Sequence, residues 1–94
     1  MTVTKHLKII GRVQGVFFRE SMRAQATKLG VSGWVRNRRE GWLEAVYHGD
    51  PQAVEELVKW ASRGPPSASV EHIDVTETGD DSEKYKGFEV RQTA

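Results

Sequence analysis

Residues 11–19 form a segment whose residue types favour the binding of an oxyanion. They read Gly-Arg-Val-Gln-Gly-Val-Phe-Phe-Arg, and the small, flexible residues let backbone N–H groups turn toward one point. A helix is predicted to follow, and its positive N-terminal end adds to the attraction for an anion. Together these features can hold an oxyanion without a metal ion. Glycines also serve ordinary turns, which is the simpler interpretation of the loop alone.

Arg19 strengthens the case for an anion site at this loop. A cation in the first turn of a helix is disfavoured by roughly 0.3–1 kcal/mol, because it faces the positive end of the helix dipole. An anion bound between the loop amides and the guanidinium would make the position of Arg19 favourable. The alternative is that Arg19 extends into solvent or pairs with a nearby carboxylate.

Asn37 is the second candidate for chemistry. It is in phase with Val31, Gly33 and Val35 in a predicted strand, so its amide is expected on their face, near the end of that strand. A buried amide must be hydrogen-bonded. The alternative role is capping of the following turn, because Asn is a common turn residue.

Other reactive side chains do not form recognisable sites. The chain has no cysteine, which excludes disulfides, thiolate nucleophiles and cysteine-ligated metals. His6, His48 and His72 are far apart and lack the spacing of metal ligands. Ser21 and Ser32 have no evident His or Asp partners and no nucleophile-elbow motif. We therefore expect no metal site and no serine nucleophile.

The length and composition indicate one folded domain that spans residues 1–94. Hydrophobic residues make up 37% of the chain and charged residues 29%, which is ordinary for a globular protein. The longest apolar run is Val16-Phe17-Phe18, too short to cross a membrane, and the start has no signal-peptide core. We expect a cytoplasmic protein with no membrane partner.

The net charge of +1 conceals an asymmetry between the two parts of the chain. Residues 1–39 sum to +8 and residues 40–94 to −7, which suggests an anion-handling region in the first part. A dipolar surface without a ligand is the alternative. The chain as a whole is not strongly basic and its aromatic residues show no RNA-stacking pattern, so no nucleic-acid partner is expected.

Hydrophobic periodicity predicts strands at about 5–12, 31–37 and 43–47, then one around Ile73 and Val75, and a short last strand at Phe88 and Val90. It predicts helices from Phe18 to Leu29 and from Pro51 to the stop at Gly64. The Trp residues are expected to pack at the sheet or helix surface. Residues 77–86 are expected to form a polar loop in which Asp80, Asp81 and Glu83 make an acidic cluster.

The resulting order is β-α-β-β-α-β plus a short terminal strand. Two helices with one apolar stripe each, and a sheet with one apolar face, bury these surfaces only against each other. The predicted class is therefore α+β, with the ferredoxin-like split βαβ arrangement, in which both helices pack on one face of a mainly antiparallel sheet.

Two motifs in the chain resemble those of a known family. Residues 11–19 resemble the first signature of the acylphosphatases. Residues 33–37, Gly-Trp-Val-Arg-Asn, with Gly41 and Gly49 after them, are similar to the second. The likeness runs over nearly the whole chain and includes the predicted order of helices and strands.

This resemblance implies hydrolysis of acyl phosphates to a carboxylate and inorganic phosphate, by a small monomeric enzyme that needs no metal or other cofactor. It also implies that Arg19 binds the phosphate and that Asn37 positions the attacking water. One departure is Leu43, where the family more often has Val, and this core difference does not touch the chemistry.

The residues fit this chemistry on their own terms. A carboxylate is a good leaving group, so no strong general acid is required, and catalysis is mostly positioning plus electrostatics. No His or carboxylate is required as base, since the bound phosphoryl group could accept the proton of the water. The electrostatic stabilisation is expected from the guanidinium of Arg19 and from the backbone amides of Gln14, Gly15, Val16, Phe17, Phe18 and Arg19.

Two alternatives remain at this point. One is a catalytically silent module that binds anions or nucleic acid through the same loop and a patch of Arg36, Arg38 and Arg39. The other is an acylphosphatase-like module of a larger carbamoyl-transfer protein. The Met1 start and the absence of a linker favour an independent protein over this second alternative.

Overall fold

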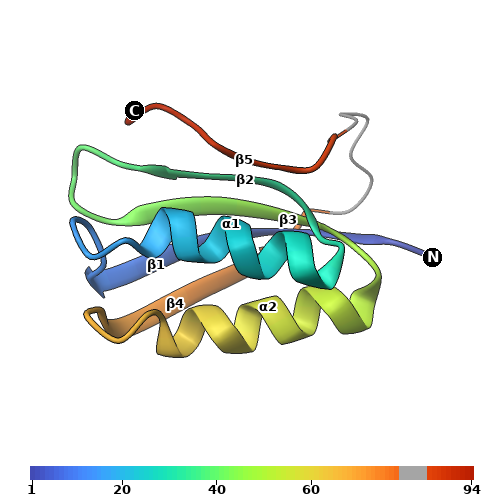
Figure 1. The fold of residues 1–94 in the computed structure, drawn as a ribbon, viewed down its shortest axis with the longest axis horizontal. Helices are drawn as coiled ribbons and strands as arrows, with labels where there is room; N and C mark the ends of the chain where they lie inside the picture. Colours follow the sequence, from blue (N-terminus) through green and yellow to red (C-terminus); the bar gives the residue numbers. More distant parts are fainter. Residues whose placement is uncertain (79–84) are drawn as a thin grey trace.

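The computed structural model describes residues 1–78 and 85–94. In these residues, two helices cover one face of a five-stranded sheet (Figure 1). The elements, in chain order, are β1 (Val3–Arg12), α1 (Phe18–Leu29), β2 (Ser32–Asn37), β3 (Leu43–Gly49), α2 (Pro51–Arg63), β4 (Ser69–Glu77) and β5 (Phe88–Val90). The residues of the predicted acidic loop, Asp80, Asp81 and Glu83, lie outside the described residues.

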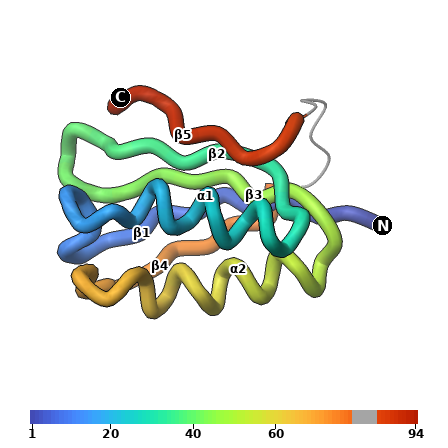
Figure 2. Tube along the Cα trace, in the orientation of Figure 1, coloured from blue at the N-terminus to red at the C-terminus, as the bar shows by residue number. Residues whose placement is uncertain are grey.

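The strands lie in the order β4-β1-β3-β2-β5. All neighbouring strands are antiparallel except β5, which runs parallel to β2. This confirms the predicted ferredoxin-like arrangement with a mainly antiparallel sheet. The topology brings the loop between β1 and α1 to the same end of the sheet as the turn between β2 and β3 (Figure 2).

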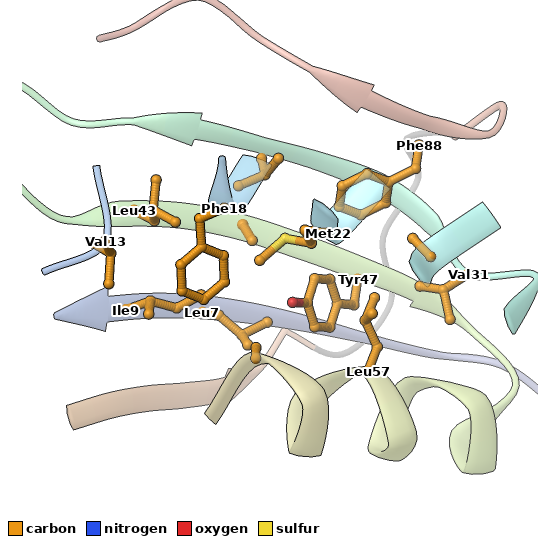
Figure 3. Close-up of a cluster of buried hydrophobic side chains, with 14 of the residues drawn as sticks. Leu7, Ile9, Val13, Phe18, Met22, Val31, Leu43, Tyr47, Leu57 and Phe88 are labelled. Carbon is orange, nitrogen blue, oxygen red and sulfur yellow. The ribbon is translucent and has the colours of Figure 1, made fainter. Parts of the chain in front are cut away.

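The core lies between the sheet and the two helices (Figure 3). Alternate residues of β1 and β3 point into it and are fully buried, as a strand with one covered face requires: Leu7, Ile9, Leu43, Ala45 and Tyr47. The helices contribute their predicted apolar stripes, Phe18, Met22 and Ala26 from α1, and Val54, Leu57 and Ala61 from α2. Val58, predicted in the second stripe, is only half-buried against the core.

The helix ends follow the sequence signals. Gly30 ends α1 in the left-handed conformation, with φ of 74°, which glycine adopts without steric strain. The side chain of Asp50 caps α2, because its Oδ2 accepts from the N–H groups of Gln52 and Ala53 at 3.1 and 3.4 Å. Gly64 ends α2 as predicted.

Strand β4 is longer than predicted and contains an irregularity. Ile10 pairs with His72 but Gly11 pairs with Val70, so Glu71 is an extra residue in β4. This insertion explains why Val70 is out of phase with Ile73 in the sequence. The strand also extends to Glu77, which was predicted to begin a loop, and Val75 is 40% exposed on this edge strand.

The three Trp side chains pack at element surfaces, as predicted. Trp60 of α2 meets Phe18 edge to face, with ring centroids 5.5 Å apart. Trp34 is 8% exposed and lies beneath the guanidinium of Arg36, 4.8 Å from its ring centroid. Trp42 is covered in the same way by the ammonium of Lys8.

Candidate active site

The loop that joins β1 to α1 has a strained backbone. Phe17 has φ 61° and ψ 24°, and it is the one non-glycine residue with positive φ in the described residues. Its neighbour in the loop, Gly15, also has a positive φ of 73°. A bulky residue in the left-handed region is a genuine outlier, and such strain is concentrated at functional sites. Left-handed residues in a loop can turn successive N–H groups to one side, as in an anion nest, and this loop has two of them, Gly15 and Phe17.

The backbone N–H groups of this loop and of the first turn of α1 find no acceptor among the described residues. Phe17 occupies the N-cap position of α1 and makes no side-chain capping bond. Within residues 1–78 and 85–94, no group accepts a hydrogen bond from the backbone N–H of any residue from Gln14 to Glu20, and Ser21 is the first in the helix to donate, to the carbonyl of Phe17 at 3.1 Å. The start of α1 therefore presents a row of free donors.

Arg19 is half-buried in the first turn of α1 and forms no ion pair or hydrogen bond with any described residue. The adjacent carboxylate of Glu20 pairs instead with Arg23, at 2.9 Å. The predicted alternative of a local carboxylate partner therefore does not apply in the described part of the chain. The guanidinium is available to an external anion, to which it can offer a planar fork of donors.

A pocket of about 560 Å³ lies against the loop and the start of α1. It brings together Gly15, Phe17, Phe18 and Arg19 of the predicted site, and Val90 of β5 is part of its wall. Three other predicted site residues are not in its lining: Gln14, Val16 and Asn37.

Asn37 ends β2 on the face that carries the helices, as predicted. It pairs with Leu43, whose side chain is fully buried. It also lies two residues after Val35, on the same face of the strand, and Val35 pairs with Val90 of the pocket wall. Its Oδ1 atom is buried and accepts no hydrogen bond from the described residues. The amide oxygen therefore does not cap the following turn, which is closed by a bond from the Arg38 N–H to the carbonyl of Trp42. A buried amide oxygen without a protein partner requires a water molecule or a ligand.

Comparisons with known proteins agree with this geometry. The family model described as acylphosphatase matches residues 5–90. The chain belongs to the acylphosphatase family. It is 58% identical over 88 residues to an acylphosphatase of Thiobacillus denitrificans, an alignment that covers 94% of this chain and 96% of that protein.

Solved structures of acylphosphatases share the fold. The structure from Coxiella burnetii has a TM-score of 0.88 at 39% identity, over 96% of this chain and 93% of its own. The structure from Bacillus subtilis has a TM-score of 0.90 at 32% identity, over 97% of this chain and 99% of its own. The predicted family, fold and enzyme class are thereby confirmed: the protein is a hydrolase that acts on acyl phosphates.

Gln14 has a role in this acylphosphatase that the sequence did not reveal. Its side-chain amide donates to the carbonyls of Arg38 and Trp42, at 2.8 and 3.1 Å. These bonds connect the loop between β1 and α1 to the turn that follows Asn37. Only the backbone N–H of Gln14 was predicted to matter, and no sequence signal reports a contact between residues 24 and 28 positions apart.

The opposite face of the sheet holds a charged network centred on Glu44. Its carboxylate is 13% exposed and accepts from His6 at 2.7 Å, Arg36 at 2.8 Å and Arg38 at 3.3 Å. Burial raises the pKa of Glu44, but the hydrogen bonds from His6 and Arg36 outweigh it and place the pKa below its usual value. Two of the arginines predicted to form a basic patch, Arg36 and Arg38, thus pair with the same internal carboxylate.

The described residues contain no group of three or more His, Cys, Asp or Glu side chains placed to hold a metal ion. Neither helix in the described part of the chain has the length and apolar character needed to cross a membrane.

Proposed function

We propose that this acylphosphatase works without a metal, that the loop amides and Arg19 hold the phosphoryl group, and that Asn37 positions the attacking water. One observation carries the proposal: an unpaired guanidinium and a row of free N–H donors border the same pocket. Both features are unfavourable in the unliganded protein, and a bound phosphoryl group satisfies both.

The reaction needs little covalent help from the protein. Water attacks phosphorus as the bond from phosphorus to the acyl oxygen breaks, so that RCO–OPO₃²⁻ and H₂O give RCOO⁻ and H₂PO₄⁻. The carboxylate leaves with the electron pair of the broken bond and needs no proton. Both protons of the water end on phosphate oxygens, which makes the bound phosphoryl group the proton acceptor.

The loop supplies the electrostatic part of catalysis. Negative charge spreads over the equatorial phosphoryl oxygens in the transition state, and fixed donors stabilise it without reorganisation. The backbone amides of Gln14 to Arg19 serve as these donors, and the Arg19 fork binds two oxygens together. The positive end of α1 points at the same group.

Asn37 supplies the positioning. Its buried Oδ1 can accept a hydrogen bond from one water O–H, which orients the oxygen lone pair toward phosphorus. The two hydrogen bonds of Gln14 keep the turn after Asn37 at a set distance from the loop. Water and phosphoryl group are then held by two elements that one side chain connects.

The test is phosphate release from acetyl phosphate and benzoyl phosphate by protein treated with EDTA. We expect turnover that equals that of untreated protein for both substrates. Loss of activity on EDTA treatment, with recovery on addition of a divalent cation, would contradict the metal-free mechanism.

We also propose a domain organisation, an oligomeric state and a cellular location for the enzyme. A single domain spanning residues 1–94 acts as a cytoplasmic monomer without a nucleic-acid partner. The large hydrophobic side chains exposed in the described residues, Met1, Phe17 and Val75, are far apart in sequence. Two of the three arginines in the predicted basic patch, Arg36 and Arg38, pair with Glu44, which lowers the charge of that patch. Sedimentation of the protein would test the monomer, and a steep salt dependence of affinity for nucleic acid would contradict the absence of that partner.

A further inference from the structure

Phe17 is an unexpected residue for its position. Its side chain is 80% exposed, so it contributes little to the core, and its backbone is left-handed, where Gly or Asn is favoured. Neither packing nor conformation therefore explains a phenyl ring here. The ring lies at the pocket that also contains Arg19.

The pocket offers more than a phosphate site. Its volume of about 560 Å³ lies within the range of roughly 300–1,000 Å³ that is typical of small-molecule pockets. Beyond the loop amides and Arg19, the lining consists of apolar side chains and one carboxylate, Glu20. Val90 of β5 is half-buried and belongs to this apolar part of the wall.

The charges around the pocket favour an uncharged group beside the phosphate. Arg19 is the single cation in the described lining, and the proposed mechanism commits it to the phosphoryl oxygens. The other charged lining residue is the acid Glu20, which pairs with Arg23 outside that lining. An additional anionic group on the substrate would find no unpaired cation in the described lining beyond Arg19, because the nearby Arg23 is already paired with Glu20.

We propose that Phe17 and Val90 form the acyl-group subsite of the enzyme, and that its preferred substrates are acyl phosphates with a neutral, apolar acyl group, aromatic or alkyl. This inference rests on the proposed phosphate site at Arg19 and the loop amides. The acyl group of such a substrate lies against the exposed phenyl ring and removes apolar surface of both from water.

The experiment compares kcat/KM for benzoyl phosphate with kcat/KM for acetyl phosphate in one protein at a time. Both substrates carry the same phosphoryl group, so any change in the loop backbone affects both and cancels in the ratio. Phe17→Asn is the main variant, because Asn tolerates the left-handed conformation and removes the apolar ring. Phe17→Leu is its matched control, since Leu retains an apolar side chain.

We expect Phe17→Asn to lower the benzoyl-to-acetyl ratio about eightfold, the effect of losing roughly 50 Å² of buried apolar contact. Phe17→Leu should lower it less. Val90→Thr replaces a methyl group on β5 with a hydroxyl of similar volume, and it should lower the same ratio. This variant provides a second test if Phe17→Asn does not fold. In the unmodified enzyme, 4-carboxybenzoyl phosphate should have a lower kcat/KM than benzoyl phosphate.

The two proposals fail in different ways. Absence of turnover with both substrates in the unmodified protein would contradict the proposed function. Turnover of both, with a ratio that changes by less than about twofold in the folded variants, the usual error of additivity, would overturn the acyl subsite alone. A larger fall in the ratio supports it.

Discussion

The two helices of this acylphosphatase begin in opposite ways. The first N–H groups of α2 are capped by the carboxylate of Asp50, and Pro51 opens the helix with a favourable backbone angle. The first N–H groups of α1 have no acceptor in the described residues, its N-cap Phe17 is strained, and its first turn carries an unpaired Arg19. The start of α2 is built for stability, whereas the start of α1 leaves in place the free donors that the proposed function assigns to a ligand.

The largest expected effect is a loss of turnover on substitution of Asn37, at the end of β2. Asn37→Ala should lower kcat on the order of 10²–10³, by analogy with the loss of one positioned polar group in other enzymes. Inhibition by inorganic phosphate should remain nearly unchanged, because the proposed mechanism gives Asn37 a contact with the water and none with the phosphate. Steady-state kinetics measure both quantities, and thermal unfolding confirms that the variant is folded. Equal losses of phosphate affinity in Asn37→Ala and Arg19→Ala would contradict the division of roles.

A substitution in the core-facing side of α2 should lower the free energy of unfolding by a comparable amount and leave phosphate binding unchanged. Leu57 is fully buried between α2 and the sheet, so Leu57→Ala should lower the free energy of unfolding by about 2–5 kcal/mol. Urea unfolding measures this loss. At a temperature where the variant is folded, its phosphate inhibition constant should match that of the unmodified enzyme. A loss below about 0.5 kcal/mol, the usual size of a surface substitution, would mean that Leu57 is not in the core.

Arg19 is the side chain at the start of α1 that should contribute most to phosphate affinity. Charge-assisted hydrogen bonds contribute about 1.5–3 kcal/mol, so Arg19→Ala should weaken inorganic phosphate binding roughly ten- to hundredfold. Arg19→Lys should not restore it, because a point charge cannot reproduce the bidentate fork. Calorimetric titration with phosphate measures the affinity. Full affinity in Arg19→Lys would show that charge alone holds the anion.

Asp50, the cap of α2, should affect stability and not phosphate binding, in contrast to Arg19. Asp50→Ala should lower the free energy of unfolding by about 1 kcal/mol, because two backbone N–H groups lose their acceptor. Asp50→Ser should retain most of the stability, since Ser also caps helices well. Neither variant should change phosphate affinity, and a weakened affinity in either would show that the two helix starts are not independent.

The comparison also explains what the sequence could predict. Asp50, Pro51 and Gly64 are local signals that satisfy local requirements, so the limits of α2 follow directly from residue types. The alternation of apolar residues likewise predicts which face of each strand is covered, including the position of Asn37. These features depend on neighbours within a few residues along the chain.

The remaining features depend on contacts between distant parts of the chain. The side chain of Gln14 bonds to carbonyls after Asn37, and nothing adjacent to it in sequence requires those partners. The extra residue Glu71 in β4 is defined only by the pairing of that strand with β1. The strain at Phe17 runs against local preference, and a positive φ at Phe could not be predicted from propensity.

The smallest expected effect is a gain in the free energy of unfolding, whereas Asp50→Ala should cause a loss. Arg19 faces the positive end of α1, so Arg19→Ala should raise the free energy of unfolding by about 0.3–1 kcal/mol in buffer without phosphate. Lys28, in the last turn of the same helix, is the matched control, because its charge faces the negative end and Lys28→Ala should lower stability by a similar amount.

Both substitutions change helix propensity by nearly the same amount, so the difference between them isolates the helix dipole. Phosphate in the buffer should cancel the gain from Arg19→Ala, because bound phosphate stabilises the unmodified enzyme more than a variant that binds it weakly. High salt should shrink the difference between the two variants through screening. A lower stability of Arg19→Ala than of the unmodified enzyme in phosphate-free buffer would mean that Arg19 has a structural partner. The start of α1 would then resemble that of α2 in being built for stability.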